Sequence, residues 1–166
     1  MVDIKNNITQ ECLRIEEDAT HSSKAHYNAA EMWSNIHYYI GIPLTLFATA
    51  AGVDSFSIDA KYAGYLALIT AVLAALQTFI SASDKSVKHK GSGSEYKSLQ
   101  NQTRLLREIQ IHKMNEDDIV QSLESLVNKR DELNRLSLSI PYRAFKKAKE
   151  GIDAGQADYL ADKGDK

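Results

Sequence analysis

The chain has 166 residues, a formal net charge of −2 and a single cysteine. A charge so close to zero gives no general attraction to nucleic acid, and one cysteine excludes a disulfide framework and a thiolate metal site. With only two prolines and eight glycines, and long stretches rich in Ala, Leu, Glu and Lys, the sequence predicts an all-α protein.

Residues 1–31 are expected to form a cytosolic amphipathic helix. Apolar, small or aromatic residues recur there at helical spacings, as Ile8, Cys12, Ile15, Ala19, His26 and Ala29, and continue with Trp33, Ile36 and Ile40. No glycine or proline interrupts this stripe before Gly41 and Pro43. The helix is therefore expected to continue into the next segment, with a proline kink near Tyr39.

Residues 32–83 are expected to form a two-helix transmembrane hairpin. Two runs, Met32 to Val53 and Tyr62 to Ser83, contain no Lys, Arg, Asp or Glu. A helix over residues 62–80 would be about 28 Å long, close to the thickness of a bilayer core. Each charged residue at the centre of a span costs about 2.5 to 3.5 kcal/mol, so the exclusion of charge favours two spans.

The flanks of the two runs predict the orientation of the hairpin. The second run is followed by four basic residues, Lys85, Lys88, Lys90 and Lys97, whereas the connecting loop has one, Lys61, beside Asp54 and Asp59. The positive-inside rule then places both termini in the cytoplasm. Aromatic residues suited to the headgroup level stand at the ends of the runs, namely Trp33, Tyr38, Tyr39, Tyr62 and Tyr65.

Small and polar residues recur along both runs, and two interpretations of them remain open. In the first, small residues let the two helices pack closely in lipid, through Gly41, Ala48, Gly52, Ala63, Ala67 and Ala74. In the second, polar residues line a pore, with Thr45, Thr49, Thr70, Gln77 and Ser81 facing water. Two helices cannot enclose a channel, so a pore requires a homo-oligomer.

Residues 84–150 are expected to form a cytosolic helical region. Lys90-Gly-Ser-Gly-Ser94 predicts a flexible break, with Gly91 and Gly93 as a hinge. An amphipathic helix is then expected over residues 94–113, on the stripe Tyr96, Leu99, Thr103, Leu106 and Gln110.

The next helix is expected to begin after Asn115, a capping residue followed by three carboxylates that suit the start of a helix. Its stripe consists of Ile119, Leu123, Leu126, Arg130, Leu133 and Leu136. It should end by Ser139, ahead of Pro141. A short basic helix is expected from Tyr142 to Glu150, and a polar tail over residues 151–166.

No pattern of catalytic or metal-binding residues is recognisable in the chain. Glu17 with His21, and Glu108 with His112, are spaced by four, whereas a di-iron helix motif needs a spacing of three. We therefore expect neither an enzyme, a cofactor nor a metal site. The basic residues Arg143, Lys146, Lys147 and Lys149 form either a solvated face or a contact with anionic headgroups.

The order of these parts resembles the SLATT family, two-span effector proteins of prokaryotic conflict systems. The resemblance is carried by Trp33 to Gly52, with His37, Gly41, Ile42, Pro43, Ala51 and Gly52; by the alanine-rich second run ending in Thr78-Phe79; by His89 with Tyr96-Lys-Ser-Leu99; and by Pro141-Tyr-Arg-Ala-Phe-Lys-Lys-Ala-Lys149. It covers most of the chain, from about residue 20 to about residue 155.

The resemblance implies a bacterial inner-membrane effector of antiphage defence. Such a protein opens or disrupts the membrane when a partner senses infection, which causes abortive infection. The implied partners are the lipid bilayer, further copies of the chain, and a cytosolic sensor protein or nucleotide-messenger system. Composition and spacing alone leave two alternatives: a non-toxic membrane scaffold that recruits a soluble partner, and a soluble helical bundle that binds a ligand.

Overall fold

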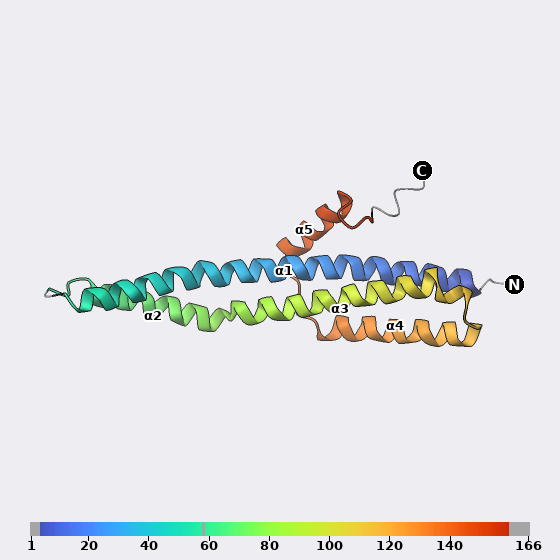
Figure 1. Ribbon diagram of the computed structural model, residues 1–166, viewed down its shortest axis with the longest axis horizontal. Coiled ribbons are helices and arrows are strands. Elements are labelled where there is room, and N and C mark those ends of the chain that lie inside the picture. The colour runs from blue at the N-terminus through green and yellow to red at the C-terminus, as the bar shows by residue number, and fades with distance from the viewer. Residues whose placement is uncertain (1–3, 58, 160–166) are drawn as a thin grey trace. The chain divides into compact units, whose positions relative to one another are not determined.

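The structure is a computed structural model that describes residues 4–57 and 59–159, and every regular element in these ranges is a helix (Figure 1). The all-α prediction is therefore confirmed. In chain order the elements are α1 (Ile4–Ser55), α2 (Ala63–Ile80), α3 (Ala82–Glu108), the short 3-10 helix η1 (Gln110–His112), α4 (Glu116–Leu136) and α5 (Tyr142–Asp153).

The chain divides into two units. One unit is Ala30–Val87, which contains the two charge-free runs and is called the apolar unit below. The other combines residues 1–29 with residues 88–166 and is called the bundle unit. The polar tail expected over residues 151–166 begins inside α5, which continues to Asp153, and its last residues, 160–166, lie outside the described ranges.

The core of the bundle unit consists of the faces that helical spacing predicts. In α1, Cys12, Ile15 and Ala19 have no exposed surface, and in α3 the same is true of Leu99. The remaining members of this core are Ile8, Tyr96, Leu106, Ile111, Ile119 and Leu126. Because each helix contributes residues three or four positions apart, the core is a continuous apolar layer among α1, α3 and α4.

The start of α4 shows why its boundary could be predicted. The Asn115 side chain accepts a hydrogen bond from the backbone N–H of Asp118 at 2.9 Å, and so caps a helix end that would otherwise leave that donor unpaired. At the other end α4 stops at Leu136, and Pro141 precedes the first residue of α5. α5 packs through three small buried residues, Ala144, Ala148 and Gly151.

The break expected at residues 90–94 is wrong as secondary structure, because α3 runs through this stretch without interruption. Gly93 is buried against α1, where a Cβ atom would lie 3.2 Å from Tyr27 Cδ1 and 3.3 Å from the carbonyl oxygen of Ser23. The Ser23 hydroxyl also donates a hydrogen bond to the Gly93 carbonyl at 2.8 Å. Tertiary packing therefore outweighs the low helix propensity of glycine here, and Gly93 serves close approach of two helices.

Replacing each of these glycines with alanine should give results of opposite sign. Gly91→Ala places its Cβ in open space and should raise the free energy of unfolding by about 0.5–1 kcal/mol. Gly93→Ala must displace Tyr27 or the Ser23 backbone and should be less stable than Gly91→Ala by about 1–3 kcal/mol. Denaturant unfolding of the full chain, followed by circular dichroism, measures the difference. Equal stabilisation by both alanines would show that Tyr27 and the Ser23 backbone can move to accommodate the Gly93→Ala side chain without loss of stability.

The helix expected over residues 62–80 is present as α2, and the charge-free run continues for three residues beyond its end. α2 ends at Ile80, and Ser81 adopts a left-handed conformation with φ 50° and ψ 43° before α3 begins. The Ser81 backbone N–H still bonds to the Gln77 carbonyl, and its hydroxyl donates to the Thr78 carbonyl at 2.9 Å. A short polar side chain that bonds locally tolerates this conformation better than a branched apolar one.

Candidate functional site

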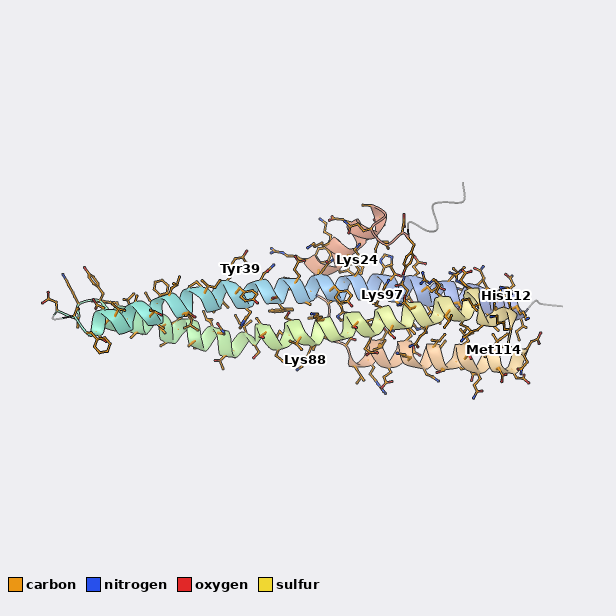
Figure 2. All side chains as sticks on the ribbon, viewed as in Figure 1. Lys24, Tyr39, Lys88, Lys97, His112 and Met114 are labelled. Atoms are coloured by element: carbon orange, nitrogen blue, oxygen red, sulfur yellow. The ribbon has the colours of Figure 1, made fainter. Side chains whose placement is uncertain are left out.

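The apolar unit exposes its hydrophobic residues. In α1, the most apolar window of 18 residues has a mean hydropathy of 1.3, and 0% of it is buried. In the stretch Ala63–His112, which comprises α2, α3 and η1, the corresponding window has a mean hydropathy of 1.9, and 6% of it is buried. None of the 18 residues of α2 is buried. Tyr39 points away from the surface of α1 and is exposed (Figure 2). On α2, Leu68, Val72 and Phe79 are exposed as well. A core helix of a soluble protein with this composition would instead be mostly buried.

The two helices of this unit face each other through larger residues than expected. The partly covered positions on α1 include Ile40, Leu44, Phe47 and Ala51, and those on α2 include Ala63, Leu66, Thr70, Leu73, Ala74 and Gln77. Of the six small residues expected at the seam, Gly41, Ala63 and Ala74 are partly covered, whereas Ala48, Gly52 and Ala67 are exposed. Branched side chains fill the space between the helices, which leaves a small-residue face of α1 uncovered.

The threonines proposed as pore-lining residues bond to their own helices. Thr45 donates to the Gly41 carbonyl at 2.9 Å, Thr49 to the Thr45 carbonyl at 2.8 Å and Thr70 to the Leu66 carbonyl at 2.8 Å. This bond to the preceding turn satisfies the hydroxyl proton without water. Thr49 is exposed on α1, whereas Thr70 is partly covered on α2, so the structure does not bring these candidates onto one face.

Gln77 differs from the threonines because its amide is not satisfied. Its Oε1 atom is buried and has no hydrogen-bond partner among the described residues. A Cβ atom on Gly41 would lie 3.4 Å from this oxygen, so the amide packs against α1 at Gly41. The amide also borders a groove of about 430 Å³ lined by His37, Tyr38, Ile42, Leu44, Thr45 and Leu46. Gln77 is thus the most polar group on the covered face of α2.

The bundle unit contains a buried pair of histidines that the sequence did not reveal as a pair. His26 and His89 are 1% and 2% exposed, and their Nδ1 atoms lie 2.8 Å apart. One ring must donate from Nδ1 while the other accepts there, so the two rings have different tautomers. Tyr96 stacks on His26 at a centroid distance of 5.5 Å and donates its hydroxyl proton to Asn134 at 2.8 Å.

Burial keeps this pair neutral. It lowers the pKa of His26 to about 4, with the neighbouring His89 as a second cause, and it also lowers the pKa of His89. No group of three or more His, Cys, Asp or Glu in the described ranges could hold a metal ion. The sequence placed His26 on a helical stripe, whereas His89 was noted only among the residues that carry the family resemblance.

A second polar cluster in the bundle unit joins α1 to α3. The Arg107 guanidinium donates to both carboxylate oxygens of Glu16, at 2.7 and 3.1 Å, and contacts Glu108. The hydrogen bond to Glu16 raises the pKa of Arg107. Nearby, burial raises the pKa of Cys12 to about 11. The thiol is therefore protonated and buried, which does not suit a nucleophile.

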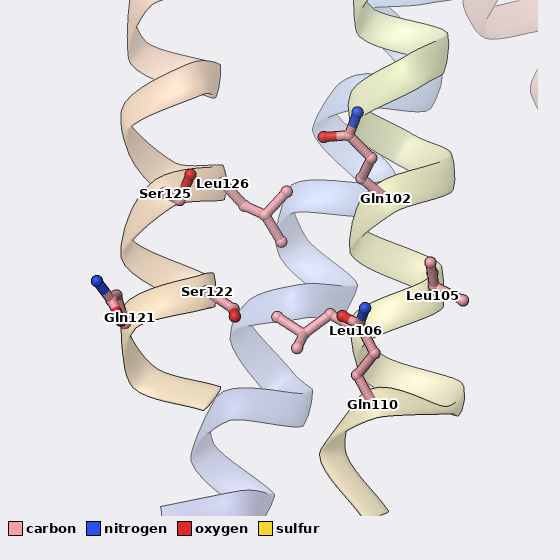
Figure 3. Close-up of a pocket in the computed structure, with 8 residues that line it drawn as sticks. All are labelled: Gln102, Leu105, Leu106, Gln110, Gln121, Ser122, Ser125 and Leu126. Atoms are coloured by element: carbon pink, nitrogen blue, oxygen red, sulfur yellow. The ribbon is translucent and has the colours of Figure 1, made fainter. Parts of the chain in front are cut away.

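A surface groove of about 430 Å³ lies in the bundle unit (Figure 3). It is lined by Gln102, Leu105 and Leu106 of α3, Gln110 of η1, and Gln121, Ser122, Ser125 and Leu126 of α4. Amides and hydroxyls surround a small apolar floor, and none of the eight residues carries a charge. The lining therefore contains no charged general acid or base, and no such group that could activate the Ser122 or Ser125 hydroxyl as a nucleophile.

These features define an all-helical protein with two long, exposed apolar helices and a bundle that contains a buried histidine pair. Comparisons with protein-family models, curated proteins and solved structures give no match to this chain.

Proposed function

We propose that this chain is a membrane-permeabilising protein of a bacterial inner membrane. Its apolar unit forms a two-span hairpin, with both termini in the cytoplasm. The observation that carries the proposal is the exposure of apolar residues, such as Leu46 on α1 and Leu68 and Val72 on α2, in two runs that contain no Lys, Arg, Asp or Glu. In water such a continuous apolar surface promotes aggregation, whereas in a bilayer it is the surface that contacts lipid.

Permeabilisation requires several copies of the chain. The side of α1 that is turned away from α2 carries Ala48, Thr49 and Gly52, and a Cβ atom at Gly52 would meet nothing within 4 Å. Small residues on a lipid-exposed face allow another helix to approach closely. We place Thr45 and Thr49 at the lumen of a homo-oligomer. Thr70 and Gln77 are partly covered in the single chain, so they reach the lumen only if α2 rotates in the oligomer and exposes this face.

The resemblance to SLATT proteins supports a biological role for such a pore. We infer that the chain acts as the toxic effector of an antiphage system, in which a sensor protein or nucleotide messenger acts on the cytosolic helices. Opening of the inner membrane would then end phage replication together with the cell. The order of the parts, from acidic helix to hairpin to cytosolic bundle, is the feature that favours this role.

Membrane potential in cells that express the chain tests the pore. Expression should depolarise the membrane, and Thr45→Leu with Thr49→Leu should slow depolarisation on the order of tenfold, because leucines dewet a narrow lumen. Thr78→Leu is a matched control, since Thr78 lies on α2 and bonds to the Ala74 carbonyl in the same way. A potential that persists at toxic expression levels would contradict pore formation, and the absence of toxicity would favour a scaffold.

A further inference from the structure

The outer face of α5 combines positive charge with aromatic residues. α5 contains four basic residues, Arg143, Lys146, Lys147 and Lys149, and two acidic ones, Glu150 and Asp153. Tyr142 is 76% exposed and Phe145 is 48% exposed on the same helix. The basic residues are exposed as well. A helix that presents lysines beside exposed aromatic rings has the composition of a membrane-surface helix.

The opposite face of α5 explains why these residues point outward. Ala144, Ala148 and Gly151 are buried, so the small residues form the contact with the bundle unit. The Asn28 side chain donates to the Ala144 carbonyl at 3.3 Å, and Lys24 lies close to Gly151, both from α1. The bundle thus fixes which side of α5 faces away, and this side carries the aromatic and basic residues.

The attachment point of α5 is close in sequence to the first apolar run. Asn28 precedes Trp33 by five residues, and five residues span at most about 18 Å of extended chain. This limit holds whatever the arrangement of the two units. If Trp33 lies at the headgroup level, as the proposed function requires, α5 is tethered near the same surface.

We propose that α5 docks on the anionic headgroups of the cytoplasmic leaflet, through its basic residues and with Phe145 and Tyr142 inserted at the interface. The inference depends on the proposed membrane insertion of the apolar unit. Charge complementarity identifies the occupant: the whole chain has a net charge of −2, so attraction to an anionic surface has to come from a local cluster such as this one. Each basic residue near such a surface strengthens binding about fivefold.

Tryptophan fluorescence of the full chain in nanodiscs tests the docking. Trp33, the only tryptophan, is changed to Phe, and Phe145→Trp then reports on α5. In phosphatidylglycerol-containing discs the emission should shift to the blue and be quenched by brominated acyl chains. Neither effect should occur in discs of phosphatidylcholine alone. Changing Arg143, Lys146, Lys147 and Lys149 to Gln should abolish both effects, and high salt should weaken them.

Two controls separate the outcomes. The first is Leu105→Trp in the same Trp33→Phe background, which probes an exposed position of α3 that should not respond to lipid charge. The second is Tyr142→Trp, which replaces the Phe145→Trp probe if the Phe145→Trp variant fails to fold. Emission typical of a water-exposed indole from the Phe145→Trp probe in both lipids would overturn the proposal and show that this face is solvated. Equal quenching in both lipids would overturn the role of charge. A chain that stays monodisperse in buffer without lipid or detergent would instead refute the proposed function.

Discussion

Replacing Val72 with Arg should make insertion of the chain into a bilayer less favourable by about 3 kcal/mol. Val72 lies near the middle of α2 and is 54% exposed. An exposed valine on a soluble protein accepts such a change within about 0.5 kcal/mol, because arginine stays hydrated there. In hydrocarbon the same guanidinium loses its water. Insertion into microsomes, measured with glycosylation reporters at the two ends of α2, should fall sharply.

Leu105→Arg is the matched control, since Leu105 is 45% exposed on α3 in the bundle unit. This substitution should leave insertion unchanged. A second arginine, at Leu68, should add a further loss of similar size, which keeps the test sensitive if one charge is tolerated by snorkelling. Should Val72→Arg instead raise the yield of chain in detergent-free buffer, without loss of helix, the apolar unit would be a soluble hairpin.

The core of the bundle unit could be predicted from sequence because its signals are local. Spacings of three and four identified Ile15 and Leu99, which are completely buried. The cap at Asn115 is also local, since donor and acceptor lie three residues apart. In both cases the helical period alone decides which atoms meet, so no knowledge of the tertiary arrangement was required.

Features that depend on contacts between distant segments could not be predicted in this way. Gly91 and Gly93 have the same local composition, yet only Gly93 packs against residues 70 positions earlier, at Ser23. The low helix propensity of glycine predicted a break, because helix propensity is a local property and does not include the packing of Gly93 against Ser23. The left-handed conformation of Ser81 could not be predicted either, since no Gly or Pro follows Gly64 in this run to mark the end of the helix.

In the candidate site, too, local features could be predicted from the sequence and contacts between distant segments could not. The sequence identified the threonines and the small residues of the apolar unit, but not which face of α1 meets α2. Both faces are uncharged, so hydropathy does not separate them, and side-chain volume decides the packing. His26 was visible as a residue in a helical stripe, whereas His89 was not assigned to one because a break was expected at residues 90–94. Their pairing at 2.8 Å depends on the register between α1 and α3, which the spacing within either helix does not fix.

Acidification from pH 6.5 towards pH 4 should destabilise the bundle unit through its buried histidine pair. The pKa of His26 is about 4 in the folded chain, against 6.5 for an ordinary histidine, which the unfolded chain approaches. The unfolded state therefore binds the additional proton between these values. The stabilisation is complete above pH 6.5 and is lost as the pH falls towards 4, up to about 3 kcal/mol. Denaturant midpoints measured by circular dichroism between about pH 7.5 and about pH 5 should show this loss.

Substitutions at the histidine pair show whether this loss comes from His26. His89→Leu leaves the Nδ1 atom of His26 buried without its partner and should cost about 1–3 kcal/mol near neutral pH. Replacing both histidines with leucine removes both polar groups, so it should recover most of that stability and flatten the pH dependence, because nothing buried remains to be protonated. His112→Gln, at an exposed position, should keep the wild-type dependence. If the double variant loses stability on acidification as steeply as the wild type, groups other than this pair control the acid response.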